Sequence, residues 1–164
     1  MADARPVSQS QVVMTELVHP IHTNALGTIF GGIIMSWVDI AAAIAAMRHC
    51  NRTVVTASID GLQFVAPVRT GWIVNLKASV NFTGKTSMEV GVRVEAENPV
   101  TNERFHTASA YLTFVALDES GNKVSVPPVS PESADEIRRF QQAEERRRIR
   151  LALRASQQPV RGLK

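Results

Sequence analysis

A single carboxylate, Asp39, lies within an almost wholly apolar stretch that runs from Phe30 to Met47. A stretch of this length that is apolar on all sides predicts a buried helix. A carboxylate in a buried helix costs several kcal/mol of folding free energy unless other polar groups pair with it or chemistry uses it. Asp39 is therefore the first candidate for a functional side chain.

Small and polar residues share the helix face of this carboxylate. They follow one another at intervals of three or four residues: Gly32, Ser36, Asp39, Ala43 and Ala46. Such a face lets another backbone or a ligand approach closely. Gly31 and Gly32 also stand where the helix is expected to begin, and free N–H groups there carry partial positive charge. These two amides could hold a carbonyl oxygen on which negative charge develops.

The same pattern also has a structural interpretation. Asp39 could be a buried carboxylate that accepts hydrogen bonds from backbone amides. The pair Gly31 and Gly32 could simply permit close helix packing. Residue types and spacing on this helix do not by themselves require an enzyme.

Length and composition predict one soluble globular domain. The chain has 164 residues, 45% of them hydrophobic, and a single cysteine, Cys50, which fits a reducing compartment. The sequence does not open with a signal-peptide pattern, so we expect a cytoplasmic protein. Asp39 argues against a membrane span, since a central Asp costs about 2.5–3.5 kcal/mol on insertion scales.

The positive charge is concentrated near the C-terminus. The net charge is +3, and residues 131–164 hold nine Lys or Arg against five Asp or Glu, a net of +4, so the rest of the chain has a net of −1. Because Glu144 and Glu145 interleave with the arginines, we favour a solvated helix over a nucleic-acid-binding segment. The four histidines lack metal-ligand spacing, and no metal site is expected.

The hydrophobic periodicity predicts one long helix, five strands and a C-terminal helix. The strands are expected at Gln9–Val18, Val54–Val65, Ile73–Phe82, Ser87–Glu97 and Arg104–Leu117, with a short extended segment at Val124–Val129. The last four strands are joined by short turns and should be antiparallel neighbours. The expected fold class is therefore α+β, with a sheet wrapped around the apolar helix.

The side-chain alternation assigns faces to three strands. Thr56, Ser58 and Asp60 should form a polar face of their strand. Phe82 should point into the core with the apolar residues of the third strand, and Glu89 should point outward. Residues 1–8 are expected to be a flexible N-terminus, residues 9–130 the domain, and residues 131–164 a charged helical tail. This tail begins with a capping box, Ser133 to Glu136, and should lie on the surface or against a neighbouring subunit.

The order of elements and several motifs resemble the hotdog fold, and more narrowly the cytosolic acyl-CoA hydrolases. The resemblance covers about residues 10–120. The matching residues are His22, Asn24, Gly27 to Gly32, Met35, Asp39, Val55, Thr56, Asp60, Phe64, Pro67, Val68, Gly71, Gly84 to Met88 and Ala110 to Val115. The run from His22 to Gly32 followed by Asp39 is the most specific part.

The resemblance implies a thioesterase that hydrolyses fatty acyl-CoA to a free fatty acid and CoA. In such enzymes the Asn and the Asp come from opposite subunits of a dimer, which we carry onto Asn24 and Asp39. Asp39 would be general base or nucleophile, and Asn24 would orient the thioester or the water. Thr56 would position water near Asp39, while the amides of Gly31 and Gly32 would polarise the carbonyl.

The turn at Lys85, Thr86 and Ser87 is the candidate site for the CoA phosphates, because it offers a cation, hydroxyls and backbone amides. Read alone, it is an ordinary hairpin turn with a solvated lysine. The resemblance also implies self-association as a dimer and a trimer of dimers. No cofactor is expected, since CoA is part of the substrate and product.

Two other functions fit the same fold. A non-catalytic acyl-CoA-binding sensor would not need Asp39 and Asn24 as reactive groups. A dehydratase acting on hydroxyacyl thioesters would need a catalytic His on the helix, and the first histidine there is His49 at its far end. We rank the sensor second and the dehydratase last.

Overall fold

The structure is a computed structural model that describes residues 3–157. Its elements in chain order are β1 (Arg5–Pro6), η1 (Val7–Ser10), β2 (Val12–Leu17), η2 (Pro20–His22), α1 (Gly31–Cys50), β3 (Thr53–Phe64), β4 (Ile73–Thr83), β5 (Ser87–Glu97), β6 (Arg104–Leu117), β7 (Val129–Ser130) and α2 (Ala134–Gln157). The predicted bounds of β5 and β6 are confirmed, and α1 continues three residues beyond the predicted apolar stretch.

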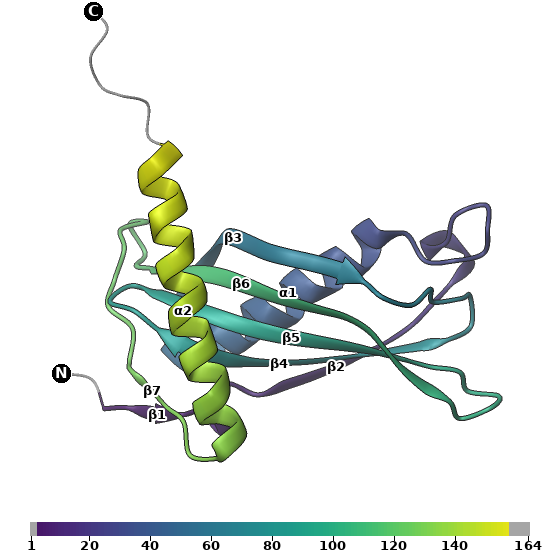
Figure 1. Ribbon diagram of the computed structural model, residues 1–164, viewed down its shortest axis with the longest axis horizontal. Helices are drawn as coiled ribbons and strands as arrows, with labels where there is room; N and C mark the ends of the chain where they lie inside the picture. The colour runs from purple at the N-terminus through teal and green to yellow at the C-terminus, as the bar shows by residue number, and fades with distance from the viewer. Residues whose placement is uncertain (1–2, 158–164) are drawn as a thin grey trace, which may run out of the picture.

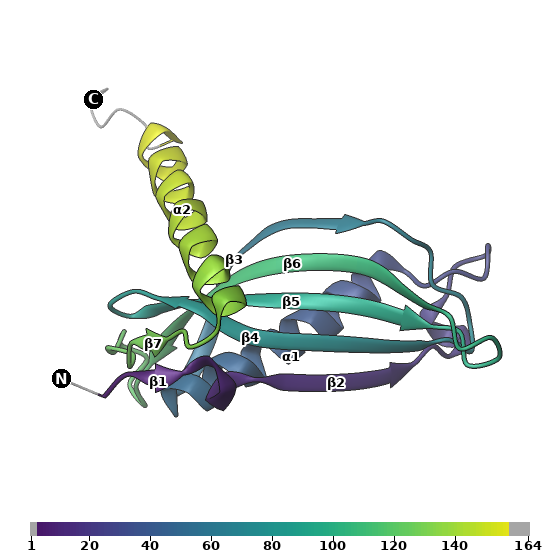
Figure 2. The same cartoon turned by 60° about the horizontal axis from the view of Figure 1, so that its bottom comes forward.

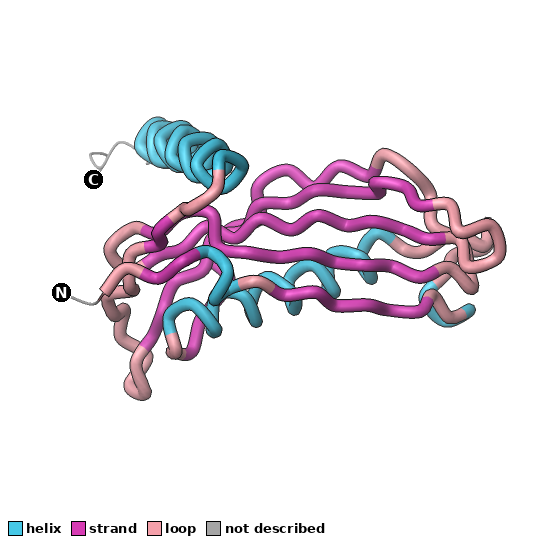
Figure 3. Tube along the Cα trace, turned by 90° about the horizontal axis from the view of Figure 1, so that it is seen from below, coloured by secondary structure: helices cyan, strands magenta, loops and turns pink. Residues whose placement is uncertain are grey.

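Five strands form one antiparallel sheet in the order β2-β4-β5-β6-β3. The sheet curves around α1, which lies along its inner face, and α2 crosses its outer face (Figures 1 and 3). β1 and β7 form a separate two-stranded parallel sheet at one end. The α+β arrangement predicted from the sequence, a sheet wrapped around one long helix, is confirmed.

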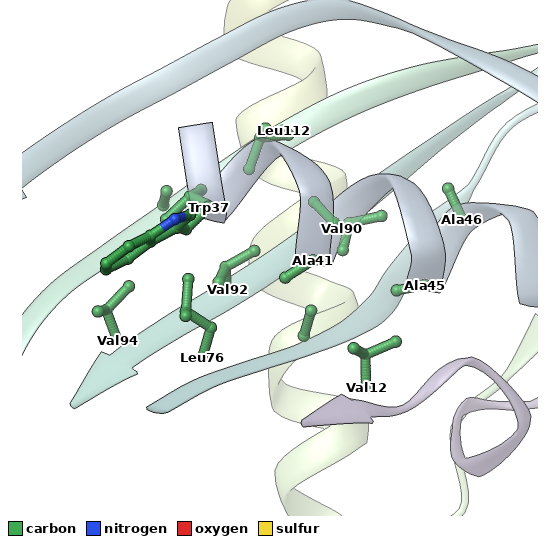
Figure 4. Packing of buried hydrophobic residues seen from close by; sticks show 14 of the residues in the cluster. Val12, Trp37, Ala41, Ala45, Ala46, Leu76, Val90, Val92, Val94 and Leu112 are labelled. Carbon is green, nitrogen blue, oxygen red and sulfur yellow. The ribbon is translucent and has the colours of Figure 1, made fainter. Parts of the chain in front are cut away.

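Alanines allow α1 to lie close to the sheet. Ala41, Ala42, Ala45 and Ala46 are fully buried. They face valines and leucines of β4, β5 and β6, which supply the bulk of the core (Figure 4). Asn51 caps the C-terminus of the helix. It has a left-handed φ of 53° and donates its N–H to the Met47 carbonyl at 2.8 Å. Packing of these alanines against the inner face of the sheet fixes the position of α1, and with it the position of Asp39.

Two side chains of the sheet test the predicted alternation. The register shifts between Val80 and Phe82, so Phe82 turns to the outer face and its ring lies 5.2 Å from the ring of Phe140 in α2. Glu89 does point outward, but only 2% of it is exposed, because α2 covers it. The prediction of a core Phe82 is therefore wrong, whereas the outward direction of Glu89 is confirmed, although α2 buries it.

The C-terminal helix packs on the sheet of its own chain. Ser133 and Glu136 form the predicted capping box: the Glu136 carboxylate accepts the Ser133 N–H at 3.0 Å, and Ser133 Oγ accepts the Glu136 N–H at 3.3 Å. Ala143 is fully buried against the sheet. The first part of α2 thus packs on the outer face, as a surface helix of its own chain, while residues 151–156 are exposed where the helix extends away from the sheet (Figure 2).

Part of the N-terminal segment is built into the fold instead of being flexible. Arg5 and Pro6 pair with β7, and Val7 is buried. The expected first strand also begins late, at Val12, because Val7–Ser10 forms a 3₁₀ turn. Ser10 Oγ accepts the Val80 N–H at 2.9 Å, so this turn is attached to β4. Apolar burial and these hydrogen bonds order the segment.

α1 is long and apolar enough to pass a test for a membrane-spanning helix based on length and composition, with a mean hydropathy of 1.4. Half of the apolar stretch of α1 that meets these criteria is buried inside the fold. A core helix of this kind meets the same criteria, and its burial against the sheet accounts for its composition.

Candidate active site

Asp39 lies in the third turn of α1 and pairs with a side chain from β3. Its Oδ1 accepts a hydrogen bond from Thr56 Oγ1 at 2.8 Å. Asp39 is only partly buried, so water and a ligand can reach it. The two residues predicted to act together, Asp39 and Thr56, are thus adjacent within one chain. This hydrogen bond holds the carboxylate in one orientation and does not involve its second oxygen, Oδ2.

Irregularities in β3 decide which of its polar residues reach Asp39. In a regular strand Thr56 and Asp60 would share one face. The register shifts between Thr56 and Ser58, and Thr56 contacts α1 whereas Asp60 pairs with Arg150 of α2 on the opposite face of the sheet. The predicted continuous polar face of this strand is therefore wrong. Because of the bulge, the Thr56 hydroxyl faces Asp39 whereas the Asp60 carboxylate faces α2.

Asn24 is held by its own loop. Its side-chain Oδ1 accepts hydrogen bonds from the Leu26 N–H at 2.9 Å, the Thr28 N–H at 3.3 Å and Thr28 Oγ1 at 3.1 Å. This is an Asx-type turn. Within residues 3–157 the side-chain NH₂ group makes no hydrogen bond, so it can donate to a ligand. The hydrogen bonds to Oδ1 fix the orientation of the Asn24 side chain, and its NH₂ group remains as a donor.

Gly31 and Gly32 form the first turn of α1, as predicted. The first intrahelical bond joins the Ile33 N–H to the Phe30 carbonyl at 3.0 Å, so the N–H groups of the two glycines have no acceptor within the helix. A Cβ on Gly31 would lie 3.2 Å from the ring of Phe64. Glycine at this position therefore lets the aromatic ring approach the helix N-terminus closely.

A pocket of about 400 Å³ opens beside Gly31. Its lining includes Thr28, Phe64, Val68 and Thr107. Thr107 is 1% exposed, and its hydroxyl has no partner among the described residues. Thr107 is the extra residue of a β-bulge, because Val94 pairs with Ala108 and Glu95 with His106. The sequence analysis missed this residue, because alternation along a regular strand gives no signal for a bulge.

The five residues predicted to act on the thioester form two groups within one chain. The Asn24 loop is tied to the start of α1, since the Phe30 N–H bonds the His22 carbonyl at 2.9 Å. Asp39 follows Gly31 by eight residues, which is about 12 Å along a helix axis. One chain therefore presents Asp39 with Thr56 at mid-helix, and Asn24 with the glycine amides at the helix start. A single thioester carbonyl cannot touch both groups of one chain.

The Lys85, Thr86 and Ser87 turn lies at the other end of the sheet from the Asn24 loop (Figure 1). The Gly84 N–H bonds the Ser87 carbonyl at 2.7 Å, and the carbonyls of Lys85 and Thr86 accept the N–H groups of Val126 and Ala116 at 3.0 and 3.1 Å. Lys85 is exposed. The turn is a hydrogen-bonded hairpin with an exposed cation, and one chain does not bring it to the helix N-terminus.

An apolar surface surrounds Asp39. Large hydrophobic side chains of α1 and of the inner face of β3 are 38–47% exposed: Met35, Ile40, Met47 and Ile59. β3 is also an edge strand of the sheet. An edge strand beside an exposed apolar helix face is a surface that another chain can cover.

Comparison with known proteins shows the family. A family model described as the thioesterase superfamily matches residues 26–102. The uncharacterized acyl-CoA thioester hydrolase YkhA of Bacillus subtilis is 45% identical over 135 residues, which cover 82% of this chain and 78% of that protein. The crystal structure of an apo-hexameric acyl-CoA thioesterase has a TM-score of 0.91 and 44% identity, covering 95% of this chain and 99% of the other.

A second solved structure, of the acyl-CoA hydrolase from Staphylococcus aureus in complex with butyryl-CoA, CoA and CoA disulfide, has a TM-score of 0.88 and 38% identity and covers 93% of each chain. Structures of that enzyme also exist with an Asp, an Asn or a Thr replaced by Ala. These three positions have the same spacing along the chain as Asp39, Asn24 and Thr56 here. The chain spans 37% of the length of the rat cytosolic acyl coenzyme A thioester hydrolase that it matches.

The fold and these matches define a hotdog thioesterase. Within that class, the chain belongs to the acyl-CoA thioester hydrolase family.

Removing the Thr56 hydroxyl should test its contact with Asp39. We expect Thr56→Val to lower kcat about tenfold, since one positioning hydrogen bond of about 1 kcal/mol or slightly more is lost. KM should change little. Initial rates of thiol release measure both constants, and Thr56→Ser is the matched control because it keeps the hydroxyl. An unchanged kcat in Thr56→Val would remove Thr56 from the mechanism.

Proposed function

We propose that this chain hydrolyses fatty acyl-CoA to a free fatty acid and CoA, with Asp39 as general base or nucleophile. The observation that carries the proposal is the partly buried Asp39 carboxylate, fixed by Thr56 at 2.8 Å at an exposed apolar surface. As general base, Asp39 would take a proton from water as the water attacks the thioester carbonyl. As nucleophile, it would form an anhydride that water then cleaves.

Asn24 of the opposite subunit would complete the site. Within one chain Asn24 stands with Gly31 and Gly32 at the helix start, and Asp39 is two turns away. A second copy covering the apolar surface of α1 and β3 would bring its Asn24 amide and glycine N–H groups to the first copy's Asp39. These donors would orient the thioester and stabilise the oxyanion. The hexameric structural relative supports assembly as a dimer and further as a trimer of dimers.

CoA would be held as part of the substrate, and the proposed chemistry needs no cofactor. The turn at Lys85, Thr86 and Ser87 would contact the phosphates, in a neighbouring subunit's site rather than its own. The related enzyme solved with CoA supports CoA thioesters as the substrate class. A cytoplasmic location would agree with the rat relative, whose name places that protein in the cytosol.

Thiol release from acyl-CoAs of increasing chain length tests this function. We expect saturable release, with one range of chain lengths preferred. Purified chain that binds acyl-CoA but releases no thiol at any length would overturn the hydrolase and favour the acyl-CoA sensor.

Replacement of Lys85 should separate phosphate binding from chemistry. We expect Lys85→Ala to raise KM for acyl-CoA about fivefold to tenfold with kcat nearly unchanged, because an exposed cation that binds phosphate contributes to ground state and transition state alike. An acyl-N-acetylcysteamine thioester, which lacks the phosphates, is the matched control and should show no change. A KM effect on both substrates would contradict a phosphate contact, and Lys123→Ala at another exposed lysine controls for general charge.

A further inference from the structure

A groove of about 500 Å³ lies on the outer face of the sheet, beneath the N-terminal half of α2. Its lining residues belong to β2, β4, β5 and β6 on one side and to α2 on the other. α1, the helix that carries Asp39, lies on the other face of the sheet (Figure 3). None of the residues proposed to act on the thioester carbonyl lines this groove.

Among the residues that the structure describes, the groove is lined by cations and by no carboxylate. Its charged lining residues are Lys77, Arg93, Arg138 and Arg139. Glu95, just outside, pairs with both Lys77 and Arg93 at 2.7 and 2.8 Å. Asp135 pairs with Arg138 at 3.1 Å. Four cations against two acids leave the groove with a net charge of +2.

Two buried donors in the groove lack partners. Asn81 is 4% exposed, and its side-chain Nδ2 makes no hydrogen bond within residues 3–157. The Nε of Arg139 is also buried and without a partner there. Both residues line the groove. Buried donors are normally paired, so two unpaired donors in one positively charged groove indicate a missing acceptor.

The backbone is shaped to place these donors. The irregularity between Val80 and Phe82 lies at Asn81. The Asn81 side chain lies over Gly91 of β5, where a Cβ would be 2.5 Å from Nδ2. Any side chain at position 91 would displace the amide. A bulge and a glycine thus combine to hold the Asn81 amide against Gly91, and both residues line the groove.

We infer that this groove binds a small phosphate-bearing anion between α2 and the sheet. Arginine and amide N–H groups are the donors that phosphate oxygens accept. The volume exceeds that of one phosphate group, so the ligand carries a pyrophosphate or an organic substituent. Two sources share this chemistry: the nucleotide end of CoA, and a separate phosphorylated metabolite.

Calorimetric titration of the full-length chain with inorganic pyrophosphate tests the inference without any turnover. We expect saturable binding, weakened at least tenfold by Asn81→Asp, which keeps the side-chain shape but replaces the donor by a negative charge. Arg139→Lys, which keeps the charge but loses Nε, should weaken binding by a smaller factor. Arg154→Gln, which removes a cation from the exposed last turn of α2, is the matched control and should bind as the wild type does.

Binding of equal strength in all four proteins, or no saturable binding in the wild type, would overturn the site. Thermal unfolding of each variant shows whether the fold is retained, and Arg139→Lys remains informative if Asn81→Asp unfolds. Competition by adenosine 3′,5′-bisphosphate, sensitive to Asn81→Asp, would assign the groove to the nucleotide end of CoA. Pyrophosphate binding that this nucleotide does not displace would assign it to a separate phosphorylated ligand.

Discussion

Two inactive variants of this chain are expected to restore activity when their subunits are mixed. Asp39→Ala and Asn24→Ala should each lower kcat/KM by 10²- to 10⁴-fold, the range typical for loss of a general base or of an oxyanion donor. A hybrid dimer would hold one site with neither substitution, because Asn24 and Asp39 of one site would come from different chains. With random exchange about half of the two-fold dimers would be hybrids, and each hybrid would have one intact site of its two. Roughly a quarter of all sites would therefore be active.

The physical reason is the spacing along α1. Asn24 is tied to the helix start by the bond from the Phe30 N–H to the His22 carbonyl, and Asp39 lies about 12 Å further along the axis. The measurement is thiol release after unfolding the mixture and refolding it together. Each variant refolded alone is the control and should stay inactive. If hybrids form, as shown by differently tagged subunits, and no activity returns, the site is not shared between chains.

Removing one arginine of α2 should produce the largest loss of stability. Arg146 binds the buried Glu89 through Nη2 at 2.7 Å and Nε at 3.2 Å, and its guanidinium lies 3.6 Å from the centroid of the Tyr111 ring. Arg150 is 4.0 Å from the same carboxylate and pairs with Asp60. Arg146→Ala would leave a carboxylate that is 2% exposed without its main partner. We expect a loss of about 3–5 kcal/mol in the free energy of unfolding.

The loss should depend on pH with a defined sign. Burial raises the pKa of Glu89 above its usual range, against the lowering effect of Arg146 and Arg150. A carboxyl whose pKa is raised in the folded protein binds more protons there than in the unfolded chain, so it stabilises the fold less as pH rises through that window. Removing Arg146 raises this pKa further. The deficit of Arg146→Ala should therefore shrink as the pH is lowered from 7 toward 5.

Urea unfolding at pH 7 and pH 5 measures both effects. Arg148→Ala is the matched control, because Arg148 is exposed and pairs with Glu145 on the outer side of α2, and exposed pairs contribute little. Glu89→Gln in the Arg146→Ala background should recover part of the stability. An Arg146→Ala protein as stable as Arg148→Ala would show that α2 does not depend on this buried ion pair.

Local periodicity was enough to predict the main elements of the domain. Alternation in Ser87–Glu97 and Arg104–Leu117 predicted both strands with their observed bounds, and the apolar run after Phe30 predicted α1. These patterns are readable because each repeats over many residues and reports which face is buried. The positions of Gly31 and Gly32 at the helix start followed from the same reasoning. The resemblance then supplied the roles of Asn24 and Asp39, which spacing alone had left open.

Only the tertiary structure decided which side chains meet. Thr56 reaches Asp39, while Asp60 turns to Arg150, because a bulge in β3 breaks the alternation that the sequence suggests. Glu89 is buried because α2 folds back across the outer face, a contact 57 residues distant along the chain. The sequence by itself determined the elements and the polar residues available for chemistry, since both depend on local pattern. Bulges and long-range packing depend on the whole fold, and they decided where each of those residues acts.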